Sequence, residues 1–173
     1  MSQTTHDRVT VTLSPDQLKT VYAHGRERDN LHAEANSFID REKTHIRGLK
    51  GEIAVAEYYG LNTDLELRPT GDNGIDFACW WLLCPVQVDV KTTEYVSNPW
   101  LKVKADGHKT ADVYILTVDD GADIELVGWA WLRDVEATDP TQETGHHTNH
   151  VLKPSDLRTM PKPQQVDPRD NER

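Results

Sequence analysis

The stretch VQVDVKTT, residues 86–93, alternates strictly between apolar and polar side chains over its first six positions. Because successive side chains of a β-strand point to opposite faces, the three valines form one apolar face. The other face carries an amide, a carboxylate and an ammonium group, from Gln87, Asp89 and Lys91. The stretch therefore predicts a half-buried strand. Taken alone, its polar row is typical of a solvated strand surface.

Outside this strand, the pattern places helices first and further strands after them. SPDQ, residues 14–17, has the residues of a capping box and predicts a polar helix towards residue 40, with Gly25 as a candidate break. A second helix is predicted over 48–60, where Gly60 ends it. The other predicted strands cover 9–13, 64–68, 75–83, 100–104, 112–118 and 125–132, with turns at 70–74, near Pro85 and at 119–123.

This order of elements predicts one α/β or α+β domain over residues 1–160. The 173-residue chain is long enough for a core of its own. Residues 161–173 are rich in proline and polar residues, so a disordered tail is predicted there.

No stretch of about 18 apolar residues is present, so the sequence predicts no membrane span. The N-terminal stretch lacks the basic and apolar blocks of a signal peptide. Cys79 and Cys84 are expected to be buried free thiols rather than a disulfide. These features favour a cytoplasmic protein, in the host cytoplasm if the protein is viral.

Charge is distributed unevenly along the chain. The formal net charge is −10, from 29 acidic residues against 19 lysines and arginines, which argues against a general nucleic-acid coat. Residues 41–50 nevertheless hold four basic residues and one acid, 4 − 1 = +3, whereas residues 119–143 hold one arginine and eight acids, 1 − 8 = −7. A basic patch on an acidic molecule therefore stays open.

Two further acids stand where burial is expected. Asp76 lies at the start of the apolar run 75–83, two residues after the turn GDNG, and an acid at the start of a buried strand needs a partner. Glu52 falls on the apolar arc of the helix predicted over 48–60, whereas Glu57 lies at its edge. The ordinary interpretations are a turn aspartate that caps its own loop and a glutamate in a salt bridge.

If strands 75–83 and 86–93 form a hairpin, its open end brings Asp76 near the level of Asp89 and Lys91. Two carboxylates at that distance can share a divalent cation, and oxygen-only ligands suit Mg²⁺ or Mn²⁺ rather than zinc. A lysine beside such a cation can orient a water molecule and stabilise negative charge on a phosphate.

GEIAVAEYYG (51–60), GDNGIDF (71–77) and VQVDVKTT (86–93) together resemble the active-site pattern of the PD-(D/E)xK nuclease superfamily. Small archaeal Holliday-junction resolvases and viral or phage nucleases are the nearest branch. The resemblance covers residues 48–132 and implies a restriction-endonuclease-like mixed sheet flanked by helices, here with an extra N-terminal helix. Two departures are Ile75 in place of the proline and a predicted strand where the superfamily usually has a helix after the lysine.

The resemblance implies Mg²⁺- or Mn²⁺-dependent hydrolysis of DNA. Asp76, Asp89 and the Val90 carbonyl would hold the metal, Lys91 would position the attacking water, and Glu52 would bind a second metal or a metal-bound water. The residues that could contact substrate are Gln87, Arg47, Lys50, Lys102 and Lys104.

Other interpretations remain open. GHHTNH, residues 145–150, holds His146, His147 and His150, for which a solvated loop competes with a zinc site. The sequence contains neither a P-loop nor a dinucleotide-binding motif, so no nucleotide cofactor is expected. The rivals to a nuclease are a non-catalytic DNA- or protein-binding protein on the same fold and a structural or viral accessory protein. A homodimer that joins two basic patches is a further alternative.

Overall fold

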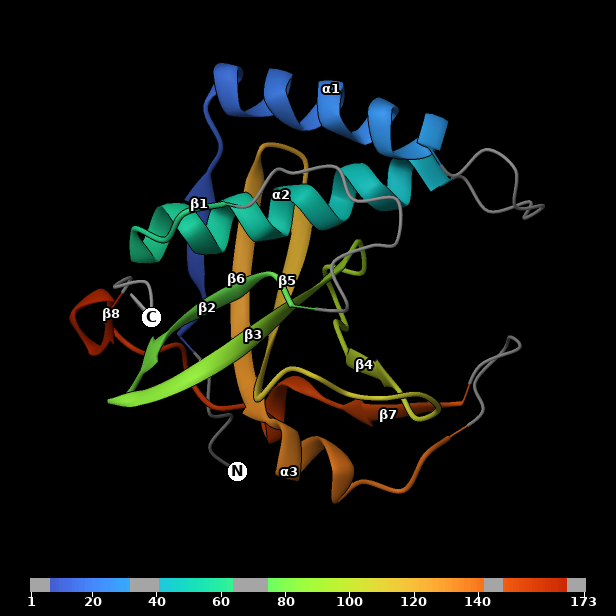
Figure 1. The fold of residues 1–173 in the computed structure, drawn as a ribbon, viewed down its shortest axis with the longest axis vertical. Coiled ribbons are helices and arrows are strands. Elements are labelled where there is room, and N and C mark those ends of the chain that lie inside the picture. Colours follow the sequence, from blue (N-terminus) through green and yellow to red (C-terminus); the bar gives the residue numbers. More distant parts are fainter. Residues whose placement is uncertain (1–6, 32–40, 64–74, 142–147, 168–173) are drawn as a thin grey trace.

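The computed structural model describes residues 7–31, 41–63, 75–141 and 148–167 (Figure 1). The helices are α1 (Pro15–Leu31), α2 (Arg41–Tyr59) and α3 (Leu132–Glu136), with short 3₁₀ turns at Pro154–Asp156 and Pro163–Gln165. The strands are β1 (Val9–Thr12), β2 (Phe77–Trp81), β3 (Cys84–Thr93), β4 (Leu101–Lys104), β5 (Val113–Asp120), β6 (Asp123–Trp131), β7 (Asn149–Leu152) and β8 (Val166–Asp167).

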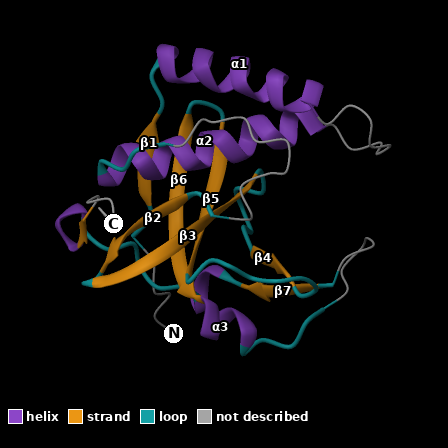
Figure 2. Cartoon of the chain, viewed as in Figure 1, coloured by secondary structure: helices purple, strands orange, loops and turns teal. Residues whose placement is uncertain are grey.

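A six-stranded sheet with the order β1-β6-β5-β3-β2-β8 forms the centre of the fold. β3 and β5 pair in parallel, and every other pair in this sheet is antiparallel. α2 packs on β1, β3, β5 and β6, and α1 packs on α2 (Figure 2). β4 and β7 form a separate two-stranded sheet. The predicted mixed α/β class is therefore confirmed.

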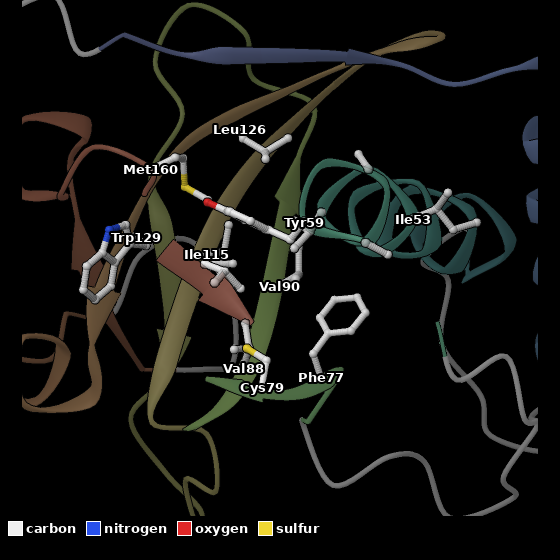
Figure 3. Close-up of a cluster of buried hydrophobic side chains, with 14 of the residues drawn as sticks. Ile53, Tyr59, Phe77, Cys79, Val88, Val90, Ile115, Leu126, Trp129 and Met160 are labelled. Carbon is white, nitrogen blue, oxygen red and sulfur yellow. The ribbon is translucent and has the colours of Figure 1, made fainter. Parts of the chain in front are cut away.

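Apolar side chains fill both faces of the large sheet. The cluster under α2 includes Val88 and Val90 of β3 together with Ile53 of α2 (Figure 3). The second cluster joins β5 and β6 to α3 and the β4–β7 sheet. β5 is buried on both faces because its side chains alternate between the two clusters. A strand that is buried on both faces needs apolar side chains at successive positions, which explains the apolar run of β5.

The start of α1 and the end of α2 agree with the sequence prediction, whereas the predicted break at Gly25 does not. Ser14 and Gln17 form the predicted capping box, since each backbone N–H donates to the other's side chain. α2 ends before Gly60, whose φ is +67°, as predicted. Gly25 does not break α1. A Cβ there would lie 2.4 Å from Ile46 Cγ1, so this glycine permits close contact with α2.

The hairpin that joins β2 and β3 turns at Leu82 and Leu83 rather than near Pro85. Both leucines have positive φ, 50° and 69°, which a tight two-residue hairpin requires. The crossover from β3 to β5, residues 94–112, contains β4 and no helix within this fully described stretch. The predicted strand 64–68 lies outside the described residues.

The predicted disorder of 161–173 is wrong for its first part. The Tyr59 hydroxyl donates a hydrogen bond to the Pro161 carbonyl, and β8 pairs with β2. The two cysteines are free, as predicted, but only Cys79 is buried and Cys84 is exposed. Among the helices that the structure describes, none combines the length and hydropathy of a membrane span.

Candidate functional site

The polar face of β3 holds a close ion pair. Lys91 Nζ lies 2.6 Å from Asp89 Oδ2, and only 9 % of the Asp89 side chain is exposed. Burial and then the negative charge of Asp89 raise the pKa of Tyr114, its neighbour on β5, to about 12. Because a buried carboxylate is costly unless it is compensated, the ammonium of Lys91 accounts for the burial of Asp89.

Asp76 is held against the same part of β3 by two hydrogen bonds. Its N–H donates to the Val88 carbonyl at 2.8 Å, and its Oδ2 accepts the Val90 N–H at 2.6 Å. These bonds reach the backbone on both sides of Asp89. Since the N–H and C=O of one strand residue point to the same edge, the Val90 carbonyl also faces the edge where Asp76 lies. The structure thus holds Asp76 against the backbone of β3 at the level of Asp89 and Val90, the level that a hairpin between the two strands predicts.

Glu52 belongs to α2. It is half-buried, and its Oε1 is the side-chain atom nearest to the site of a Cβ on Gly48, at 3.9 Å. The carboxylate therefore lies back over the preceding helical turn. α2 covers the face of β3 that carries Val88 and Val90, whereas Asp89 projects from the opposite face.

Within the described ranges, no three His, Cys, Asp or Glu side chains converge closely enough to hold a metal ion. The expected gathering of Glu52 with the two aspartates is therefore not present in this part of the chain. The reason is topological: a strand places alternate side chains on opposite faces, and α2 lies on only one of them.

A pocket of about 640 Å³ opens beside Lys91. Its lining consists of residues 91–98, Trp100, Lys102 and Leu116. The backbone between β3 and β4 forms one wall, and β4 contributes Lys102. Lys104 is exposed on the same face of β4 as Lys102 but lies outside the pocket lining.

Three other predicted substrate contacts have different environments. Arg47 forms an ion pair with Glu94, one of the pocket residues. Gln87 is exposed on β3. Lys50 is only 6 % exposed, and its ammonium donates to Asp119 Oδ1 at 3.0 Å and to the Gly121 carbonyl at 2.9 Å. Lys50 therefore ties α2 to the β5–β6 turn, and this buried role replaces the predicted contact with substrate.

The histidine motif also has a structural member. His150 is buried, and its Nδ1 donates to the Thr138 carbonyl at 2.9 Å. This bond links Thr138, just after α3, to β7. His146 and His147 lie outside the described residues.

Sequence reasoning missed Tyr95 and Trp100, which line the pocket. The available signal was their position: two aromatic residues flank the turn-rich stretch VSNP directly after the Asp-x-Lys strand. Periodicity does not reveal such residues, because they lie between regular elements.

Comparisons of the chain with protein-family models, curated proteins and solved structures found no significant match.

Proposed function

We propose that this protein is a metal-dependent nuclease that hydrolyses DNA phosphodiester bonds at the open end of the β2–β3 hairpin. The observation that carries the proposal is the 2.6 Å pair of Asp89 and Lys91, with Asp76 bonded to the adjacent Val90 N–H. This combination of acids and an amine stands at the edge of a pocket that is large enough for a ligand.

The donor groups suit a hard divalent cation. Mg²⁺ in enzymes usually binds one or two carboxylates and completes its shell with waters and substrate phosphates. Asp76, Asp89 and the Val90 carbonyl are oxygen donors of this kind. A Mg²⁺ site therefore does not require a third acidic side chain. A cation bound there would supply Lewis-acid polarisation of a phosphate oxygen and a more acidic water.

Lys91 is the positively charged side chain of the proposed site. Its side chain is 38 % exposed and lines the pocket, so its ammonium can reach a ligand there as well as Asp89. In the pocket it can donate to a non-bridging phosphate oxygen or hold the attacking water. The proposed site consists of the two aspartates and the Val90 carbonyl, and Glu52 on α2 is not part of it.

A cleavage assay tests this function. Supercoiled, linear, single-stranded and four-way DNA are incubated with the protein in Mg²⁺, Mn²⁺ or EDTA. Cleavage with either metal and none in EDTA is expected. Lys91→Ala and Asp89→Asn should each lower the rate by about 100-fold or more.

Lys19→Ala is the matched control, because Lys19 is an exposed lysine on α1, outside the pocket. It should cleave at the wild-type rate. Metal-dependent cleavage that survives in both Lys91→Ala and Asp89→Asn would refute the assignment.

The second candidate is a non-catalytic DNA- or protein-binding protein on the same fold. It is favoured by the net charge of −10 and by the close compensation of Asp89 by Lys91. It predicts binding without cleavage of any DNA, and little loss of binding in Lys91→Ala.

A further inference from the structure

The pocket beside Lys91 differs in charge from a second pocket of about 580 Å³ between α1 and the C-terminal part of α2. The charged residues of the first are Lys91, Lys102 and Glu94, which gives 2 − 1 = +1. Those of the second are Asp16 and Glu57, which gives 0 − 2 = −2. On a chain with a net charge of −10, the first pocket therefore suits an anionic ligand.

The first pocket also carries aromatic surface in contact with water. Tyr95 is 67 % exposed, although large aromatic side chains usually bury most of their area. Trp100 is half-buried, and its Nε1 donates to Asn98 Oδ1 at 3.0 Å, so its ring is fixed by its own loop. Two aromatic rings at the wall of a pocket provide planar apolar surface for another ring.

Aromatic surface and positive charge occur side by side here. Lys102 Nζ lies 5.8 Å from the centroid of the Trp100 ring, a cation–π distance. The ammonium lies over a face of the Trp100 ring, so the pocket holds positive charge next to its aromatic surface. Sites for single-stranded nucleic acid combine aromatic side chains, on which the bases stack, with basic side chains that bind the phosphates.

We infer that this pocket receives an unpaired nucleobase of single-stranded DNA, stacked on the exposed Tyr95, with its phosphate on Lys102. A base inside a duplex is already stacked on both faces and cannot present a ring to the protein unless it leaves the helix. The inference rests on the proposed function, since Lys91 joins the pocket to Asp89 and would put the bound strand beside the reacting groups.

The test measures binding by the full chain in EDTA, so that metal-dependent cleavage does not interfere. Fluorescence anisotropy is recorded with an end-labelled oligo-dT strand, an abasic strand of equal length and a duplex of equal length. Oligo-dT should bind at least about ten-fold more tightly than the other two, because base stacking is lost in both. Tyr95→Ala should weaken oligo-dT binding by between about five-fold and about 100-fold and leave abasic binding unchanged.

Tyr22→Ala is the matched control, since Tyr22 is 44 % exposed on α1 and lies outside the pocket. It should bind as the wild type does. Lys102→Ala should weaken oligo-dT and the abasic strand by the same factor, because it removes a phosphate contact.

Equal affinity for oligo-dT and the abasic strand, or wild-type affinity in Tyr95→Ala, would overturn the inference. The outcome is separate from that of the proposed function. Base-dependent binding without cleavage in any metal supports the pocket and contradicts the nuclease. Cleavage with no difference between oligo-dT and the abasic strand supports the nuclease and contradicts the pocket.

Discussion

Replacement of Gly51 by alanine tests the placement of α2 on the sheet. Gly51 is buried, and a Cβ there would lie 2.1 Å from Thr92 Oγ1 and 2.6 Å from Thr117 Oγ1. The Thr117 hydroxyl donates to that of Thr92 at 2.9 Å, so the added methyl group meets a hydrogen-bonded pair. Both threonines belong to paired central strands and cannot move away freely.

The size of the effect follows from three terms. Overpacking a well-filled site costs about 1–3 kcal/mol, and loss of the hydroxyl pair costs about 1 kcal/mol more. The higher helix propensity of alanine relative to glycine stabilises the folded state by about 1 kcal/mol. The free energy of unfolding should therefore fall by about 1–3 kcal/mol. At this chain length a loss of about 2 kcal/mol lowers Tm by roughly 4–8 °C.

Gly48→Ala, one turn earlier on α2, is the matched control. Its Cβ would meet Glu52 Oε1 at an ordinary contact distance of 3.9 Å, so helix propensity alone should raise stability by about 1 kcal/mol. Thermal and urea unfolding followed by circular dichroism measure both variants. The double variant Gly51→Ala/Thr92→Ala should recover part of the loss, since the closest atom is removed. If Gly51→Ala is as stable as Gly48→Ala, α2 does not lie this close to β3 and β5.

Three further predictions concern single groups. Asp76→Ala should destabilise the protein by about 1–3 kcal/mol in urea unfolding, because the Val90 N–H loses its acceptor, whereas Asp76→Asn should lose less; equal stability of wild type and Asp76→Ala would contradict this. A thiol reagent at pH 8 should modify the exposed Cys84 and spare Cys79, because burial raises the pKa of the Cys79 thiol to about 11; equal modification rates in the folded protein would contradict this. The raised pKa of Tyr114 stabilises the folded protein fully below pH 10, and this stabilisation is lost as the pH rises to about 12, because the unfolded chain releases the phenol proton first. In an absorbance titration, Tyr114→Phe should form one phenolate fewer than the wild type between pH 10 and about 12. Identical titration curves of the two proteins would contradict this prediction.

The parts of the fold that the sequence predicts are those with local causes. Alternation in residues 86–93 predicts β3 and its shared polar face, and the capping box at Ser14 predicts the start of α1. The turn at Leu82 and Leu83 was missed because leucine rarely adopts positive φ, so the sequence gives no sign of a turn there. The order of residues 161–167 depends on pairing with the distant β2, which no local pattern encodes.

In the candidate site, too, the features with local causes are predictable from the sequence and those that depend on distant contacts are not. The pairing of Asp89 with Lys91 follows from strand periodicity, and the approach of Asp76 follows from a hairpin between neighbouring strands. The place of Glu52 depends on which face of β3 α2 covers, and helical periodicity alone cannot decide that. The pocket depends on how β4 folds back against β7, a contact between segments far apart in the chain.

We propose that Asp76 and Asp89 bind a divalent cation at the open end of the hairpin, and calorimetric titration of Mn²⁺ into the wild-type protein and into Asp89→Asn measures that binding. One binding event is expected in the wild type, and Asp89→Asn should abolish it while circular dichroism shows both proteins to be folded. Identical Mn²⁺ binding by the two proteins, or no binding by the wild type, would contradict it.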